Sequence, residues 1–143
     1  MQSVHVSTRK GIFAVSFSDW KRVFANAERH LNDGGCFIFD INTQKKLNRL
    51  IAEPAWVHEF EDNLLIMDVT AAPQHTSNWN IKVFERRNGN RYVLHEENIR
   101  EASFPVPQIV SALKSQFRRI RVIDPKRRRA SSPSETLYFI CKR

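Results

Sequence analysis

The sequence predicts an α/β domain, and three observations support this prediction. Cys36–Phe39 is apolar without alternation, which is typical of a strand covered on both faces within a parallel sheet. A helical pattern ends at Leu31, and the turn Asn32–Gly35 contains glycines that can adopt the positive φ needed at a helix end. A third region, residues 55–101, alternates like several antiparallel strands.

Composition indicates one soluble globular domain. The chain has 143 residues, of which 41% are hydrophobic and 27% charged. It has no apolar run of membrane-spanning length and no signal-peptide core, so we expect a cytoplasmic protein without a membrane partner. Two cysteines without C-x-x-C spacing predict free thiols, and five histidines without a helical i, i+4 pair predict no metal site.

The charge is strongly segregated along the chain. The net charge of +8 lies entirely in residues 114–143, where ten Lys and Arg residues accompany only Asp124 and Glu135. Such a segment could bind a nucleic acid or another polyanion, or could simply be a solvated loop. The candidate polyanion-binding residues are Arg118, Arg119, Arg121, Lys126, Arg127, Arg128 and Arg129.

The N-terminal part contains one clear helix. Met1–Lys10 shows no period, and Ile12–Phe17 fits either a short buried strand or an extension of the helix that follows. Ser18 and Asp19 are the expected N-cap, with the acidic residue near the positive end of the helix dipole. The expected core stripe consists of Trp20, Phe24, Ala27 and Leu31.

After the buried strand, the pattern changes from helical to β. Thr43 is the expected cap of a helix that ends near Ile51, before Pro54. Asn88-Gly89 predicts a two-residue type I′ hairpin turn, because both central residues there need positive φ. The expected strands are Trp56–Phe60, Leu64–Thr70, Trp79–Phe84 and Arg91–Arg100. They form an antiparallel insertion with one covered face.

The C-terminal part returns to α/β order. Pro105 and Pro107 are suited to open a helix. Its expected stripe is Val106, Ile109, Val110, Leu113 and Phe117. A strand at Ile120–Ile123, a basic loop at Pro125–Ser134 and a strand at Thr136–Cys141 follow.

In this order the elements resemble the C-terminal half of a class I S-adenosylmethionine-dependent methyltransferase of the small-molecule type. His30–Gly35 is similar to the family's "hLxxGG" lead into strand five, and Phe37–Thr43 is similar to strand five followed by "D-x-N-T". Trp56–Glu97 resembles a β-rich insertion after strand five. The resemblance implies a partial Rossmann-like methyltransferase sheet (strands five to seven) with an antiparallel β insertion at about 55–101. Residues 1–143 would then form a single partial domain.

The family's cofactor-binding motifs have no counterpart here. The chain has four glycines and no Gly-rich turn after a strand, and the family's ribose-binding carboxylate also precedes the matching region. The resemblance implies S-adenosylmethionine as cofactor, but we expect no useful binding by this chain alone. We therefore expect a truncated, methyltransferase-like protein that is inactive as an isolated chain.

Candidate substrate-binding residues follow from the resemblance and from residue type. Asp40 and Asn42 would face the family's active cleft, or would help Thr43 cap the next helix. Aromatic side chains could line a pocket or simply be core, and a polar trio at 95–97 could supply an acid/base pair or a solvated face. The full candidate set is Asp40, Asn42, Trp56, Trp79, Tyr92, His95 and Glu97, and no catalytic residue is assigned.

The resemblance also has a consequence for association. In the family, strand five is interior, so Phe37–Phe39 would here present an unpaired apolar edge. We expect a homodimer, a complementing chain, or Ile12–Phe17 folding back as a substitute strand. Cys36 and Cys141 would lie on neighbouring strands as small buried apolar residues. A third interpretation of the chain is a remnant without activity.

Overall fold

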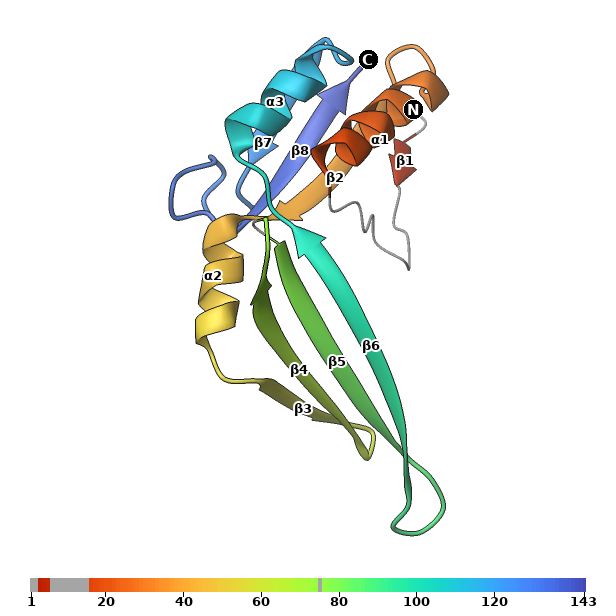
Figure 1. The fold of residues 1–143 in the computed structure, drawn as a ribbon. Helices are drawn as coiled ribbons and strands as arrows, with labels where there is room; N and C mark the ends of the chain where they lie inside the picture. Colours follow the sequence, from red (N-terminus) through yellow and green to blue (C-terminus); the bar gives the residue numbers. More distant parts are fainter. Residues whose placement is uncertain (1–2, 6–15, 75) are drawn as a thin grey trace.

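The computed structural model describes residues 3–5, 16–74 and 76–143, and within them it contains two four-stranded sheets and three helices. The first sheet has the order β1-β2-β8-β7 and the second the order β3-β4-β5-β6. The second sheet extends away from the first as a long twisted arm (Figure 1). None of the described helices is long and apolar enough to cross a membrane.

The first sheet is built on β2 (Cys36–Asn42), as the sequence predicted. On one side β2 pairs antiparallel with β8 (Thr136–Lys142), which pairs antiparallel with β7 (Arg119–Ile123). On the other side it pairs in parallel with β1 (Ser3–His5), through Cys36–Ile38.

The expected bare edge at Phe37–Phe39 is therefore wrong for Phe37 and Ile38. The strand that pairs there comes from Ser3–His5, a region in which the sequence showed no period, and not from Ile12–Phe17. Residues 12–15 lie outside the described part of the chain, and Phe17 is already helical.

Helix α1 (Phe17–His30) begins earlier than expected. Its N-cap is Ser16, whose hydroxyl accepts from the backbone N–H of Asp19 at 3.2 Å, so the assignment of Ser18 and Asp19 as the cap is wrong. Asp19 lies instead in the first turn, where its negative charge interacts favourably with the positive end of the helix dipole. The helix ends at Leu31 as predicted, and Gly34 takes φ +74 in the following turn.

One face of the first sheet carries the core. Phe37, Ile41 and Phe139 point to this side, as the pairing register requires, and α1 and α3 (Val106–Lys114) pack on it. The core cluster has ten buried members: Phe24, Leu31, Phe37, Ile41, Ile109, Leu113, Phe117, Leu137, Phe139 and Cys141. The predicted helical stripes are thus confirmed as core.

The opposite face of β2 is only partly covered, so the expectation of a strand buried on both faces is wrong. Cys36 and Ile38 are half-buried, and Asp40 is exposed. The register adds Tyr138 and Ile140 of β8 to this side. We call these five residues, with Asn42 at the end of β2, the open face of the first sheet.

The two cysteines lie on neighbouring strands and are free. Cys141 is fully buried, and its burial raises the pKa of its thiol to about 12. Cys36 is half-buried on the open face. Because Cys141 pairs with Phe37 in the core, the two thiols point to opposite sides of the sheet.

Helix α2 (Gln44–Ala52) joins the two sheets. Thr43 caps it as predicted, accepting from the backbone N–H of Lys46 at 3.4 Å. Its buried Leu47 belongs to the side that packs on β4 (Asn63–Ala72). Arg49 donates to Glu135 at 2.7 Å and thereby ties the helix to the segment that enters β8.

The arm consists of four consecutive antiparallel strands: β3 (Trp56–Phe60), β4, β5 (Thr76–Arg86) and β6 (Tyr92–Ala102). The predicted hairpin at Asn88-Gly89 is confirmed, but its two-residue type I′ turn is wrong. Arg87 N–H donates to Arg91 C=O at 2.9 Å, and of the loop residues only Gly89 has positive φ. The loop is therefore longer, and Asn88 keeps an ordinary conformation.

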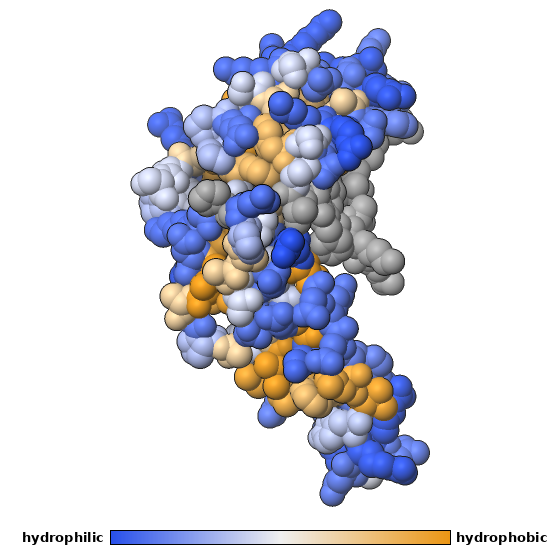
Figure 2. Space-filling model, viewed as in Figure 1, coloured by the Kyte–Doolittle hydropathy of each residue, from blue (hydrophilic) through white to orange (hydrophobic). Residues whose placement is uncertain are grey.

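The register assigns the arm side chains to two faces. Val69, Trp79 and Ile99 occupy one face, which we call the Trp79 face, and Phe84 and Leu94 occupy the other. The expectation of one covered face is wrong for the outer strands, since β3 is exposed throughout and most of β6 is exposed. Figure 2 shows apolar side chains gathered on the arm surface.

Candidate functional site

The two sheets meet through a hydrogen bond between Asn42 and Glu101. The Nδ2 of Asn42, at the carboxyl end of β2, donates to Oε1 of Glu101, near the end of β6, at 2.9 Å. Ser103 Oγ, two residues beyond, donates to the backbone C=O of Asn42 at 3.1 Å. The polar tip of β2 is thus fixed to the base of the arm.

Helix α2 contributes a lysine to this junction. Lys46 Nζ donates to Oδ1 of Asn42 at 2.8 Å and to the hydroxyl of Thr136 at 3.4 Å. Asn42 therefore uses both ends of its amide, one toward the ammonium and one toward the Glu101 carboxylate. The Lys46 ammonium is also close enough to Glu101 for its charge to lower the pKa of that carboxyl.

Glu101 is an acidic residue of the junction whose carboxyl pKa departs from its ordinary value. Burial raises the pKa of its carboxyl, against the opposing effects of the Asn42 hydrogen bond, the Lys46 charge and the Trp79 indole. The negative charge of Asp40 raises it further. A carboxyl with a shifted pKa, next to the carboxyl end of a strand, is a candidate for ligand contact.

Two buried polar atoms beside Glu101 lack a hydrogen-bond partner within the described residues. Ser77 is 1% exposed, pairs directly across from Glu101, and its hydroxyl is unsatisfied. Trp79 Nε1 is also buried and makes no hydrogen bond of good geometry, although it lies near enough to lower the pKa of Glu101. Buried polar groups without partners are uncommon in native proteins and call for an explanation.

The structure brings some of the predicted residues together and separates others. Asp40 and Asn42 share the open face of the first sheet, and Asn42 contacts the arm. Trp56 and Trp79 share the Trp79 face, but Trp56 is on the outer strand and half-exposed. Tyr92 lies on the opposite face, so one pocket lined by Tyr92 and both tryptophans does not fit the register.

His95 and Glu97 occupy the Trp79 face, with Glu96 on the other, as alternation predicted. Both are exposed. His95 Nε2 contacts Glu85 at 2.9 Å rather than Glu97, and Glu96 pairs with Lys82 at 3.1 Å. His95, Glu96 and Glu97 are therefore solvent-exposed side chains of the sheet.

Sequence reasoning missed Lys46, Ser77 and Glu101. Lys46 lies four residues after Asn42, across the predicted cap, so a contact back to the strand end was foreseeable. Glu101 lies four positions after Glu97, so strand alternation puts both side chains on the same face of the sheet. Its proximity to Asn42 depends on how the sheets join, which no local pattern encodes.

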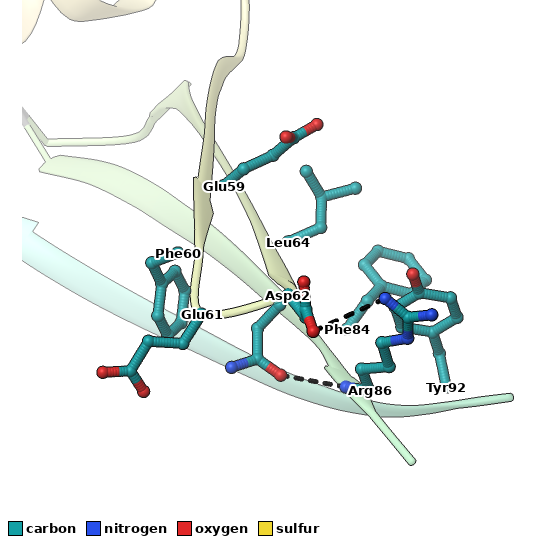
Figure 3. A pocket seen from close by; sticks show the side chains of 9 residues that line it. Glu59, Phe60, Glu61, Asp62, Leu64, Phe84, Arg86 and Tyr92 are labelled. Carbon is teal, nitrogen blue, oxygen red and sulfur yellow. Dashed lines mark hydrogen bonds and ion pairs between the residues drawn. The ribbon is translucent and has the colours of Figure 1, made fainter. Parts of the chain in front are cut away.

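A separate pocket of about 540 Å³ lies at the tip of the arm. Figure 3 shows Arg86 reaching toward Asp62, with which it forms an ion pair at 3.5 Å, and Tyr92 beside them. The Tyr92 side chain is 51% exposed, and Asp62 is also solvent-exposed. The residues that line this pocket belong to the tip of the arm, whereas the Asn42–Glu101 contact lies at its base.

The candidate polyanion-binding residues lie on β7 and in the loop after it. Arg119 and Arg121 share one side of β7 and are exposed, as are residues 126–129. Arg127 is engaged with the buried Asp124 at 3.2 Å. Asp124 also accepts from Ser134 Oγ at 2.6 Å, and this contact is the main cause that lowers its carboxyl pKa to about 2.

The glycines among the described residues lie away from the Asn42–Glu101 contact. Gly34 and Gly35 lie at the start of β2, opposite to the Asn42 end, and Gly89 is in the arm hairpin. Within the described part of the chain, no group of His, Cys, Asp and Glu side chains could hold a metal ion.

The elements together form a partial α/β fold of the methyltransferase type with an antiparallel β arm after the central strand. Comparison with solved structures supports this conclusion. A S-adenosylmethionine-dependent methyltransferase from Clostridium acetobutylicum is 22% identical and superimposes with a TM-score of 0.77, covering 91% of this chain and 53% of that one. The methyltransferase CcbJ from Streptomyces caelestis is 14% identical with a TM-score of 0.63, covering 88% and 50%.

The sugar N-methyltransferase KedS8 from Streptoalloteichus is 13% identical with a TM-score of 0.63, covering 92% of this chain and 52% of its own. The chain therefore has the fold of part of a S-adenosylmethionine-dependent methyltransferase and spans about half the length of these structures. No family profile and no curated protein matches the sequence.

Proposed function

We propose that this chain supplies the acceptor-binding half of a S-adenosylmethionine-dependent methyltransferase. The observation that carries the proposal is the Asn42–Glu101 hydrogen bond, because it joins the polar end of the central strand to the base of the arm. Ligands of open α/β sheets bind beyond the carboxyl ends of the strands, which is where this junction lies. The methyl acceptor would rest on the Trp79 face, beside Asp40 and Asn42.

The likeness to methyltransferases of small molecules supports the same proposal. Among the similar structures, one is titled a sugar N-methyltransferase and another, of 8% identity, an amino pentose methyltransferase bound to S-adenosylmethionine. By this likeness the cofactor is S-adenosylmethionine and the acceptor a small molecule. In this proposal the residues that bind the cofactor come from polypeptide outside 1–143, because the sequence shows no Gly-rich turn after a strand.

The open face of the first sheet is the proposed contact for that polypeptide. Ile38 and Ile140 are half-buried and Tyr138 is 38% exposed there, so a packed layer would remove apolar surface from water. The additional polypeptide can be another segment of the same protein, a partner chain or a second copy. With β1 already paired to the β2 edge, this face replaces that edge as the proposed site of association.

Calorimetry tests whether this chain needs additional polypeptide to bind S-adenosylmethionine. The chain alone, titrated with S-adenosylmethionine, should give no measurable binding heat. Mixing it with the part of the Clostridium methyltransferase that it does not match should restore binding. Ile140→Asp on the open face should abolish the restored binding, whereas Arg129→Asp in the loop should not. Tight cofactor binding by the isolated chain would contradict the proposal.

A polyanion-binding module is the second candidate function. The observation favouring it is the excess of +8 within residues 114–143, with Arg119, Arg121 and Arg128 exposed. Binding of duplex DNA or tRNA driven by phosphates must weaken steeply with salt. A titration at several salt concentrations should show a steep negative slope, and an absent or salt-independent interaction would remove this candidate.

A further inference from the structure

The junction between the sheets combines charge, buried polar atoms and an apolar floor. Glu101 is half-buried there, and the Asp40 charge is near enough to raise the pKa of its carboxyl. Ser77 and Trp79 lie on the same arm face as Glu101, with Ser77 directly opposite it. Directly paired residues on one face of a sheet have Cβ atoms about 5 Å apart, so the side chains of Ser77 and Glu101 start side by side on this face.

The hydrogen bonds of the junction leave part of this cluster unsatisfied. Asn42 supplies one donor to Oε1 of Glu101, and Lys46 is occupied by Asn42 and Thr136. Among the described residues, the buried Ser77 Oγ has no partner. A carboxylate has room for about four hydrogen bonds, so Glu101 retains accepting capacity. A ligand that donates N–H groups would complement it.

The net charge of the cluster selects the sign of the ligand. Asp40 and Glu101 contribute two carboxylates and Lys46 one ammonium, which donates to Asn42 Oδ1 and lowers the pKa of Glu101 by its charge. The indole of Trp79 adds an aromatic surface, which attracts cations. An ammonium group near Glu101 would offset the cost of burying its charge.

We infer that Glu101, with Asp40, Ser77 and Trp79, forms a recognition site for the amino group of a small-molecule acceptor. The inference rests on the proposed function for its biological meaning, since it specifies the class of acceptor. Glu101 binds the ammonium, Asp40 adds long-range attraction, and the Ser77 hydroxyl accepts a further N–H. Trp79 and Ile99, neighbours on this face, would contact the carbon skeleton.

Three probes of nearly equal shape test the sign of the ligand: cyclohexylamine, cyclohexanol and cyclohexanecarboxylate. Each is titrated into the ¹⁵N-labelled chain while the indole N–H resonance of Trp79 is followed, assigned with Trp79→Phe. Cyclohexylamine should bind about tenfold more tightly than cyclohexanol, the ratio expected of one charge-assisted hydrogen bond. Cyclohexanecarboxylate should bind least.

Matched variants test whether Glu101 causes the preference for the amine. Glu101→Gln keeps the size of the side chain and an acceptor for Asn42, and should remove the preference for the amine. Glu96→Gln lies on the same strand but on the opposite face, is exposed, and should leave the preference unchanged. Unaltered heteronuclear spectra away from the site confirm that both variants are folded.

The possible results separate the inference from the proposed function. Equal binding of amine and alcohol at Trp79, tightest binding of the carboxylate, or an unchanged preference in Glu101→Gln overturns the amine site but leaves an acceptor site. A Trp79 resonance that none of the three probes shifts overturns both the amine site and the proposed acceptor half. Loss of the preference in Glu96→Gln would also overturn the assignment to Glu101.

Discussion

Asn42 and Glu101 are 59 residues apart in the sequence and are joined by a hydrogen bond of 2.9 Å. Asn42 ends the strand on which the first sheet is built, and Glu101 lies near the end of the last strand of the arm. The contact therefore fixes the relation between a packed α/β layer and an extended antiparallel sheet. It also makes the half-buried carboxyl end of β2 one side of a candidate site.

Asn42→Ala should destabilise the protein measurably. The change removes the donor to Glu101 and leaves a half-buried carboxylate without that partner, which costs about 1–3 kcal/mol of unfolding free energy. Urea denaturation at pH 7 measures it. Asn48→Ala is the control, because Asn48 only accepts an exposed hydrogen bond from Gln44 and its loss should cost less than about 0.5 kcal/mol. Equal losses in the two variants would show that the junction contributes nothing.

Glu101 should give the protein a distinctive dependence on pH. Its carboxyl pKa is raised in the folded state, mainly by burial, above the ordinary value of 4.5. The folded state therefore binds the proton more tightly, so its contribution to stability is complete below pH 4.5 and is lost as pH rises through the folded value. Unfolding free energies of the wild type should fall relative to Glu101→Gln over this interval. A difference independent of pH would contradict the shift.

Asp124 should give the stability a pH dependence of the opposite sign. Ser134 and the backbone N–H of Lys126 donate to its carboxylate, and its pKa is lowered from 3.8 to about 2. Its contribution to stability is therefore present above pH 4 and is lost as pH falls from about 4 to 2. NMR titration of the carboxyl carbon measures the pKa directly. Ser134→Ala should move that pKa back toward 3.8, while Ser132→Ala, at an exposed neighbouring position, should leave it unchanged.

Phe139→Ala should be severely destabilising. Phe139 is fully buried in the core and stacks on Phe39 with ring centroids 4.9 Å apart. Removing a buried phenyl ring leaves a cavity and costs about 3–5 kcal/mol. Tyr138→Ala, one position earlier and 38% exposed on the open face, should cost clearly less. Chemical denaturation of the two variants provides the comparison, and a smaller loss for Phe139→Ala would contradict the assigned facing of β8.

Local patterns in the sequence were sufficient for most elements and for the side on which the helices pack. The spacing of Phe24, Leu31 and Leu113 marks surfaces that must leave water, and the structure buries all three. Thr43 and the Asn88-Gly89 loop were recognisable because capping and turning depend on one or two residues. In contrast, Cys36–Phe39 contains only apolar residues, so its alternation between a core face and an open face left no trace in residue type.

The sequence by itself determined the class of fold, the order of the elements and the predicted positions of Asp40 and Asn42 at a strand end, because these follow from periodicity and short-range stereochemistry. Only the tertiary structure decided that Ser3–His5 pairs with β2, that Tyr92 faces away from Trp79, and that Glu101 meets Asn42. These relations depend on strand register and on how two sheets join. Both are fixed by contacts between residues distant in the chain, to which no local pattern is sensitive.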